Sequence, residues 1–323
     1  MKLEWDSRIK LREEDVILRQ KNVDSAPRVT IGLPTYRRGH LIHRALASIA
    51  AQTYRDFVLI VSDDLGEDAE TLEAVRALSN AFPEIILVSQ KENLGMIGNF
   101  KYLLAAAETE YFMWISDDDE ISPDYLEELV GLLDADPDTV TAMGKWMDMT
   151  SPTDGVIREQ IRPEGTQRMQ RLFHFVAGNA DDSAFYGVHR TDCLRQSRVP
   201  NYLPPNRGVL TNFCYLLLFD MLWLGRFRFG QSATWICHNY TEKDYNRALA
   251  GGVADRLRTL LRRLNVYAIY IGKTARKGPI LIPPILAASL LGFACDIVAA
   301  AWRLTNRVVR HRMSAGTSAK VKK

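Results

Sequence analysis

A run of apolar residues passes into acidic residues at positions 111–120, which read Tyr-Phe-Met-Trp-Ile-Ser-Asp-Asp-Asp-Glu. The first five side chains show no polar alternation, which is typical of a short strand buried on both faces of a sheet. Asp117, Asp118 and Asp119 follow almost at once, so three carboxylates stand at the carboxyl end of this strand. The stretch therefore predicts a buried strand that carries acidic groups to one edge of a sheet.

Three more apolar runs precede this one, and segments with apolar residues at helical spacing separate them. The predicted strands are residues 29–33, 57–61, 85–88 and 111–115, and the predicted helices are residues 40–52, 70–81 and 98–109. Strands that alternate with helices predict an α/β fold with a doubly wound, mostly parallel sheet flanked by helices. Ligands of such sheets bind beyond the carboxyl ends of the strands, so we expect the functional site there.

Polar residues follow the other strands as well. Residues 34–38 (Pro-Thr-Tyr-Arg-Arg) follow the first strand, residues 62–64 (Ser-Asp-Asp) the second and residues 93–99 the third. The carboxylates at 117–119 repel one another, and a cation would compensate them. Their oxygens suit Mg²⁺ or Mn²⁺, and Mg²⁺ commonly binds through one or two carboxylates together with substrate phosphates. The alternative is a solvated acidic turn that caps the next helix, but Asp63 on a neighbouring strand favours the metal site.

These motifs resemble those of family-2 glycosyltransferases, and residues 28–125 are similar to the nucleotide-sugar-binding half of that family's GT-A fold. The matching motifs are Pro34-Thr35-Tyr36, Leu46-Ala47-Ser48-Ile49, Gln52-Thr53-Tyr54, Val61-Ser62-Asp63-Asp64, Asn93-Leu94-Gly95 and the DxD-type Asp117-Asp118-Asp119. They occur in the family's order and approximate spacing. The resemblance extends loosely over residues 126–240.

The resemblance implies a role for the residues at the first two strand ends. Pro34, Thr35 and Tyr36 would line the pocket for the nucleotide base, with the tyrosine ring as a stacking face. Asp63 would accept a hydrogen bond from the base or the ribose. Arg38 matches no motif residue, and it would either contact phosphate or act only as a solvated charge at the start of a helix.

Further roles are implied at the third and fourth strand ends. Asn93 and Gly95 would form the loop beside the nucleotide, because glycine allows close backbone approach. Asp117 and Asp118 would face the ribose or the sugar of the donor. Asp119, together with Asp117, would coordinate the Mn²⁺ or Mg²⁺ that bridges the diphosphate and stabilises the leaving group.

A base that deprotonates the acceptor is the part of the family pattern that this sequence lacks. Its expected position holds Thr211-Asn212-Phe213-Cys214, without a carboxylate, and Asp220 beyond it looks like a residue of an apolar helix. The best substitute is Asp182, with Asp181 beside it, ahead of a run similar to the family's acceptor-side strand; the alternative is an ordinary turn pair. His238 follows the last predicted strand, where it would approach the diphosphate or serve as a structural histidine.

The total net charge of +2 hides two opposite regions. Residues 1–252 carry 27 basic and 37 acidic side chains, whereas residues 253–323 carry 14 basic and two acidic ones. Residues 253–276 and the stretch after Pro283-Pro284 both show apolar positions at helical spacing beside basic residues. In the second stretch the small, polar and basic positions fall on one stripe, which is Ser289, Gly292, Asp296, Arg303, Arg307 and Arg310.

Two basic amphipathic helices of this kind predict a peripheral anchor on an anionic membrane surface. The uncharged residues 280–295 are fewer than the roughly 20 that a spanning helix needs. The alternatives are packing of the helices on the protein's own domain or on a partner, and a membrane span. An extensive apolar face without a recognition motif argues against nucleic acid as a partner.

The predicted organisation has four parts. They are an N-terminal extension (1–27), the nucleotide-sugar-binding half of a GT-A domain (28–125), its acceptor-binding half (126–252) and the membrane-associating helices with a tail (253–323). Four widely spaced cysteines without a Cys-x-x-Cys pair favour a reducing compartment, and the first residues lack the apolar core of a signal peptide. We therefore expect a cytoplasmic protein, peripheral on the cytoplasmic face of the cell membrane.

The predicted function is metal-dependent transfer of a sugar, with inversion, from a nucleotide diphosphate sugar to a hydroxyl. The basic helices, together with what is usual for the family, imply a lipid-linked or saccharide acceptor in surface polysaccharide or glycolipid synthesis. The alternative is a non-catalytic nucleotide-sugar-binding or scaffold subunit at the membrane, because Thr211-Asn212 stands where a base is expected.

Overall fold

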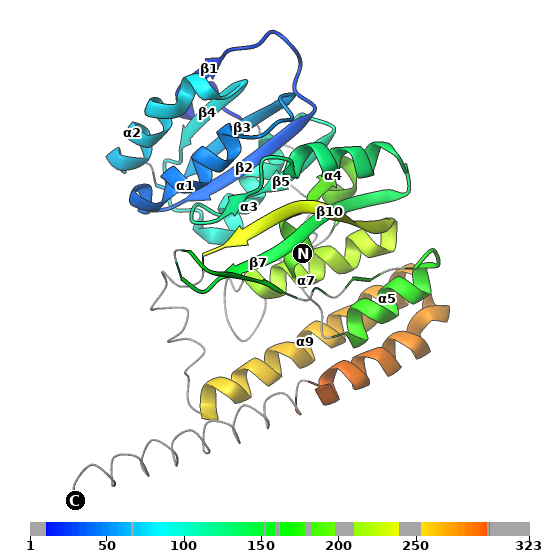
Figure 1. Ribbon diagram of the computed structural model, residues 1–323. Coiled ribbons are helices and arrows are strands. Elements are labelled where there is room, and N and C mark those ends of the chain that lie inside the picture. Colours follow the sequence, from blue (N-terminus) through cyan, green and yellow to red (C-terminus); the bar gives the residue numbers. More distant parts are fainter. Residues whose placement is uncertain are drawn as a thin grey trace, which may run out of the picture.

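The computed structural model describes residues 11–65, 68–151, 153–158, 160, 162–163, 165–178, 182–197, 210–238, 253–295 and 297. For residues 210–212, 253–260 and 262–263 it describes the backbone alone. One mixed sheet runs through the described residues, and helices cover both of its faces (Figure 1).

The sheet of the described residues has ten strands, in the order β1-β4-β3-β2-β5-β9-β7-β10-β6, with β8 paired to β7. The strands are β1 (Val16–Lys21), β2 (Val29–Thr35), β3 (Phe57–Asp63), β4 (Glu84–Ser89), β5 (Tyr111–Trp114), β6 (Glu120–Ile121), β7 (Thr139–Met149), β8 (Gly155–Arg158), β9 (Val188–Arg190) and β10 (Arg226–Cys237). Strands β4, β3, β2 and β5 are parallel neighbours, and β7 runs parallel to β10. The mostly parallel α/β sheet predicted from the sequence is therefore confirmed.

Helices and short 3-10 turns connect these strands. They are α1 (Gly39–Ala50), α2 (Ala69–Leu78), α3 (Gly95–Ala106), α4 (Tyr125–Asp134), α5 (Arg168–Ala177), α6 (Thr191–Gln196), α7 (Leu210–Leu224), α9 (Val253–Lys277), η1 (Glu13–Asp15), η2 (Ser79–Ala81), η3 (Ser183–Tyr186) and η5 (Pro279–Leu281). The helices predicted at 40–52, 70–81 and 98–109 correspond to α1, α2 and α3, each with its end shifted by a few residues.

Side-chain alternation along β5 separates the helices onto two faces of the sheet. Tyr111 Oη donates a hydrogen bond to Asp134 Oδ1 at the end of α4, at 2.6 Å. Trp114 Nε1 donates to the carbonyl of Phe100 in α3, at 3.0 Å. Because positions 111 and 114 point to opposite sides of a strand, α4 and α3 cover opposite faces. Helix α7 contacts α3, and α5 and α9 pack on α7 from the side away from the sheet (Figure 1).

The segment predicted as an N-terminal extension contributes a strand to the sheet. Strand β1 pairs antiparallel with β4 at the sheet edge, and its side chains alternate between half-buried and exposed. Arg19, Gln20 and Lys21 lie in this strand, and charged residues on an edge strand discourage pairing with other chains. The sequence did not predict β1 because its apolar run, Val16-Ile17-Leu18, is only three residues long and lies within a charge-rich segment.

The predicted C-terminal helices are present. Helix α9 ends at Lys277, before Gly278 and Pro279, and residues 282–295 form a second helix after η5. Within the described part of the chain, none of the helices combines the length and the apolar character that crossing a bilayer requires.

Helix α9 is attached to α7 by a stacked pair of rings and by buried ion pairs. The rings of Tyr270 and Phe219 stack with centroids 4.4 Å apart. Asp220 of α7 is 1% exposed and pairs with Lys273 and with Lys277, whose Nζ lies 2.8 Å away. Asp220 is thus a helix residue, as the sequence predicts, and its carboxylate is engaged by α9.

Candidate active site

The carboxyl ends of β2, β3 and β5 meet at one edge of the sheet, which we call the carboxyl edge. Thr35 and Asp63 pair in register at the ends of β2 and β3. Past β5 the Ile115 N–H donates to the Gly32 carbonyl at 3.0 Å, so the chain continues alongside β2. There Thr35 Oγ1 donates to Asp117 Oδ2 at 2.9 Å. The structure therefore gathers these three predicted site residues at a common edge.

Arg38 pairs with the acidic segment. Its Nη1 lies 3.3 Å from Asp117 Oδ1, and its Nη2 forms an ion pair with Asp118. Arg37 has a φ of 56°, a left-handed conformation that non-glycine residues rarely adopt, and it turns the chain from β2 toward α1. Tyr36, in the same turn, is 40% exposed, and the Arg37 guanidinium lies over its ring, 5.1 Å from the centroid.

Burial makes two of the carboxylates difficult to ionise. Asp117 is 5% exposed and Asp119 is 6% exposed. Burial raises the pKa of Asp117 to about 7; the Arg38 guanidinium opposes this rise, and the charge of Asp118 adds to it. Burial, together with the Asp118 charge, also raises the pKa of Asp119 to about 7. Arg38 alone therefore does not compensate the segment, and these two carboxyl groups hold protons up to about pH 7 unless a further cation is present.

Strand β10 holds Asp119 from the other side. Trp235 Nε1 donates to Asp119 Oδ2 at 3.1 Å, and the backbone N–H of His238 donates to Asp119 Oδ1 at 3.0 Å. Strand β6 begins at Glu120, the residue after Asp119, and pairs antiparallel with β10. Both donors are neutral, so they orient the carboxylate without balancing its charge.

The His238 side chain belongs to a second cluster beside Asp119. Its Nε2 lies 2.6 Å from Glu120 Oε1, and the same oxygen lies 3.5 Å from Arg44 Nε. Burial lowers the pKa of His238, which favours the neutral imidazole. The histidine therefore has a structural partner, and its predicted approach to the diphosphate stays a prediction.

A bulge in β10 sets the position of Trp235. The pairing of β10 with β7 shifts register between Phe229 and Thr234. The Glu128 carboxylate of α4 accepts hydrogen bonds from the bulge; the donors are the N–H groups of Gln231, Ser232 and Ala233 and the Ser232 hydroxyl. Neither Glu128 nor Trp235 could be predicted as a site residue from the sequence, because their partners are 103 to 116 residues away and no local pattern marks the pairs.

Asn93 lies in the loop between β4 and α3, beside the end of β3, and Gly95 is the first residue of α3. Gly95 has a φ of 70°, and a Cβ added there would meet nothing within 4 Å, so the backbone conformation is the reason for glycine. Asn93 Oδ1 accepts the Gly95 N–H at 2.8 Å, and Asp64 Oδ1 accepts the Leu94 N–H at 2.7 Å. Asp64 therefore ties this loop to the end of β3, next to the buried Asp63.

The candidate base Asp182 stands directly before η3 and is half-buried. Tyr186 of η3 packs on Trp235, with ring centroids 4.6 Å apart, and its Oη lies 3.4 Å from Ser116 Oγ. The η3 turn therefore adjoins both the start of the acidic segment and the tryptophan that holds its last aspartate. Asp181 lies outside the described residues.

The acidic segment fits a cation only if other ligands complete the site. Within the described residues, no group of three or more His, Cys, Asp and Glu side chains could hold a metal ion. Carboxylate oxygens are nevertheless the donors that Mg²⁺ and Mn²⁺ prefer, and the partners of Asp119 on β10 are neutral. The arrangement therefore fits a divalent cation that shares one or two carboxylates with the phosphates of a ligand.

Residues 30–191 match the sequence profile of glycosyl transferase family 2, and the match spans half of the chain. The chain belongs to this family. The family resemblance of the strand-end motifs is thereby confirmed.

Several bacterial glycosyltransferases are similar to part of this family-2 chain. An uncharacterized glycosyltransferase of Haemophilus influenzae is 28% identical over 141 residues, 43% of each chain. The putative colanic acid biosynthesis glycosyl transferase of Escherichia coli is 33% identical over 101 residues, 31% of this chain and 36% of that one. The GalNAc(5)-diNAcBac-PP-undecaprenol beta-1,3-glucosyltransferase of Campylobacter jejuni is 31% identical over 105 residues, 32% of this chain and 34% of that one. The matched region spans less than half the length of these relatives.

Two solved structures share the fold of this family-2 member. S. aureus TarS in complex with UDP-GlcNAc matches with a TM-score of 0.53 and 18% identity over 74% of this chain and 66% of that one. The mannosyltransferase PcManGT from Pyrobaculum calidifontis, in complex with GDP-Man and Mn²⁺, matches with a TM-score of 0.54 and 19% identity over 86% of this chain and 76% of that one. At such identities the likeness concerns the fold, and it confirms the predicted GT-A architecture.

Proposed function

We propose that this family-2 protein transfers a sugar, with inversion, from a nucleotide diphosphate sugar to a hydroxyl of a lipid-linked or saccharide acceptor. The observation that carries the proposal is the buried acidic segment 117–119, in which Arg38 alone does not compensate the carboxylates. Such a site suits a donor that brings a divalent cation with its diphosphate. The two structures that share the fold, one in complex with UDP-GlcNAc and the other with GDP-Man and Mn²⁺, support this donor class.

The donor is proposed to lie along the carboxyl ends of β2 and β3. The residues proposed to contact its base and ribose, or to form the loop beside them, are Pro34, Thr35, Tyr36, Asp63, Asn93 and Gly95. The exposed Tyr36 ring offers a stacking face. Arg38, which pairs with Asp117 and Asp118, would exchange these carboxylates for the diphosphate.

Asp119, with Asp117, is the proposed ligand pair for Mn²⁺ or Mg²⁺. The cation would stabilise the charge that develops on the diphosphate leaving group. Trp235 and the backbone N–H of His238 hold the Asp119 carboxylate in one orientation, so it reorganises little during the reaction.

Asp182 is the proposed base, with Asp181 as its neighbour. Its carboxylate would take the proton of the acceptor hydroxyl, and the acceptor oxygen would attack the anomeric carbon on the face opposite the departing nucleoside diphosphate. This geometry inverts the configuration of the sugar. The packing of Tyr186 on Trp235 supports the assignment, because it joins the segment that carries Asp182 to the acidic segment.

A lipid-linked acceptor is supported by one relative and by the C-terminal helices. The C. jejuni relative is, by its name, a glucosyltransferase for a PP-undecaprenol-linked glycan. We therefore assign donor binding to residues 28–125, acceptor binding to 126–252 and membrane contact to 253–323. The protein would then work at the cytoplasmic face of the cell membrane, in surface polysaccharide or glycolipid synthesis.

A panel of nucleotide diphosphates and nucleotide sugars, each with Mn²⁺ or Mg²⁺, tests the proposal. Thermal stabilisation identifies the donor, and release of the nucleoside diphosphate in the presence of extracted lipids measures turnover. Asp182→Asn should lower turnover by about 100-fold or more and leave the donor-induced thermal shift unchanged.

The matched control is Asp192→Asn, at an exposed position of α6, which should keep full turnover. Full turnover of Asp182→Asn would remove Asp182 as the base. A wild-type protein that binds the donor and never turns it over would instead be the non-catalytic scaffold subunit.

A further inference from the structure

The helix of residues 282–295 turns an apolar surface away from the protein. Its exposed side chains, together with that of Ile297, are all apolar; they are Pro283, Leu286, Ala287, Leu290, Leu291, Ala294, Cys295 and Ile297. Leu290 is 64% exposed, Leu291 is 52% exposed, and Ile280 in the preceding turn is 85% exposed. With 3.6 residues per turn, these positions cover about half of the helix circumference.

The small and polar positions of this helix pack on the protein. Ser289 is buried, and its hydroxyl donates to the Ile285 carbonyl at 2.7 Å. A Cβ added at Gly292 would lie 2.6 Å from Tyr267 Oη and 2.7 Å from the Val176 carbonyl, so this close contact requires glycine. The sequence predicts that Ser289 and Gly292 lie on a stripe separate from the apolar face. In the structure this stripe packs on the protein, and the apolar face does not.

Helix α9 has the same arrangement. Its buried side chains are Val266, Tyr267, Tyr270 and Thr274. Where the side chains of α9 are described, at Leu261 and at residues 264–277, its exposed stripe is mostly apolar or small: Leu261, Leu264, Ala268, Gly272 and Ala275 lie there beside Asn265. The exposed Arg276 follows at the end of this stripe.

Contacts on the inner face prevent α9 from turning its apolar stripe inward. A rolled α9 would break the ion pairs of the buried Asp220 with Lys273 and Lys277, and would separate Tyr270 from Phe219. Losing the cations of a buried carboxylate is strongly unfavourable. The outward stripes therefore belong to the folded protein and need a partner of their own.

The charge of the region indicates which partner fits. Apolar surface of this extent on a folded domain marks an interaction site. Residues 253–323 carry 14 basic and two acidic side chains. A partner that suits both properties offers an apolar layer to the leucines and negative charge to this basic part of the chain, as does a bilayer that contains anionic phospholipid.

We propose that the outward faces of α9 and of the helix of residues 282–295 insert into the headgroup–acyl boundary of an anionic bilayer leaflet. Arg276 meets the phospholipid headgroups beside the inserted leucines. The inference deepens the proposed function in that it places the enzyme beside a lipid-linked acceptor, but it rests on exposure, packing and charge alone.

Sedimentation with vesicles tests the inserted face. The full chain is mixed with vesicles of phosphatidylcholine, either pure or with about one third phosphatidylglycerol. The wild type should bind the anionic vesicles, and the double variant Leu290→Glu/Leu291→Glu should bind them at least about 10-fold more weakly. Arg276→Glu should weaken binding to the anionic vesicles by about 5-fold.

The matched control is Ile17→Glu on the edge strand β1, where the isoleucine is 51% exposed; it should bind vesicles as the wild type does. All these positions are exposed, so the variants should keep the wild-type circular dichroism spectrum and melting temperature. Equal vesicle binding by the wild type and the leucine variant would overturn the proposal.

Sedimentation velocity separates lipid from a second copy of the chain. A wild-type dimer that the leucine variant abolishes, without any vesicle binding, would assign this face to self-association and refute the lipid proposal. The donor-induced thermal shift of the leucine variant should equal that of the wild type. A protein that binds vesicles but no nucleotide sugar would contradict the proposed function and leave the membrane surface standing.

Discussion

Aspartates at the two edges of the sheet have pKa values that are shifted in opposite directions. At the carboxyl edge, burial raises the pKa of Asp117 and of Asp119 to about 7. At the amino edge, where the parallel strands begin, hydrogen bonds from Arg28 lower the pKa of Asp134. The pKa of Asp136 is also lowered there: burial acts to raise it, but hydrogen bonds outweigh the burial.

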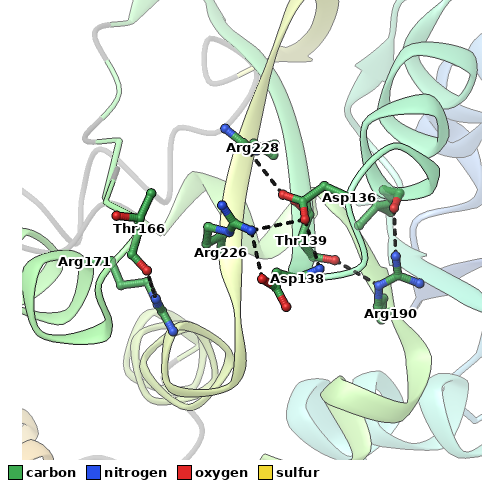
Figure 2. A network of polar contacts seen from close by, with 9 residues as sticks. Asp136, Asp138, Thr139, Thr166, Arg171, Arg190, Arg226 and Arg228 are labelled. Carbon is green, nitrogen blue, oxygen red and sulfur yellow. Dashed lines mark hydrogen bonds and ion pairs between the residues drawn. The ribbon is translucent and has the colours of Figure 1, made fainter.

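Figure 2 shows the part of the amino edge where β7 and β10 begin. Arg226 Nη2 lies 3.2 Å from Asp136 Oδ1 and 2.9 Å from Asp138 Oδ2, and Arg228 Nη2 lies 3.2 Å from Asp136 Oδ2. Thr139 Oγ1 donates to Asp136 Oδ2 at 2.9 Å. Each of these two carboxylates has an arginine, so little charge is left to recruit a ligand. The comparison indicates that imbalance of charge, rather than charge itself, marks the functional edge.

The largest expected effect comes from removing the unbalanced charge. Asp119→Asn should reduce turnover of the donor by about 100-fold or more, because a proposed metal ligand is lost. It should also abolish the additional thermal stabilisation that Mn²⁺ gives in the presence of the donor. Asp136→Asn at the amino edge is the control and should keep full turnover. Equal turnover of both variants would show that the two edges do not differ in function.

The pH dependence of stability tests the comparison directly. Folded Asp119, with its pKa raised to about 7, keeps a proton that the unfolded chain loses near its pKa of about 3.9. The contribution of Asp119 to the free energy of unfolding is therefore largest below about pH 4 and is lost as the pH rises to about 7.

Denaturant titrations at a series of pH values measure this effect as a difference between variants. The free energy of unfolding of Asp119→Asn relative to wild type should increase by about 2–4 kcal/mol from pH 4 to pH 7 and then level off. Buried His189, whose pKa burial lowers to about 4, contributes in the opposite direction, but it does so in both proteins and cancels. At the amino edge, Asp134 and Asp136 should lose their contribution only below about pH 4. A difference that does not change between pH 4 and pH 7 would contradict the burial argument.

Glu128→Gln tests whether the β10 bulge positions the site at the carboxyl edge, because it leaves the carboxylates of that edge unchanged. The variant weakens the hydrogen bonds that hold the β10 bulge, and the free energy of unfolding should fall by about 1–3 kcal/mol. Donor affinity measured by calorimetry should fall as well, because the bulge positions Trp235 at Asp119. Glu127→Gln, at the adjacent exposed glutamate of α4, is the control. Lower stability with unchanged donor affinity would show that the bulge does not position the site.

The smallest expected effect is at the amino edge. Arg226→Gln removes a partly exposed cation from two carboxylates, and the free energy of unfolding should fall by about 1 kcal/mol. Turnover and donor affinity should stay at the wild-type level. Arg76→Gln, at an exposed position of α2, should leave the free energy of unfolding unchanged. A loss of donor binding in Arg226→Gln would mean that the amino edge also serves the site.

Much of the fold could be predicted because its signals are local. The uninterrupted apolar runs gave β2, β3, β4 and β5, and the helical spacing gave α1 to α3. Strand β1 was not predicted because its three apolar residues lie within a charge-rich segment. Of the site, Thr35, Asp63 and Asp117 could be placed at one edge because parallel strands bring their carboxyl ends together.

By itself, the sequence determined which residues stand at the strand ends and that the last part of the chain is basic and amphipathic, because both properties depend on near neighbours along the chain. Only the tertiary structure decided which partner each carboxylate meets: Arg38 for Asp117 and Asp118, and Trp235 for Asp119. It also decided that Gly292 packs inward, so that the leucine face of its helix points outward. These contacts join residues far apart in sequence, and they depend on packing that no local pattern records.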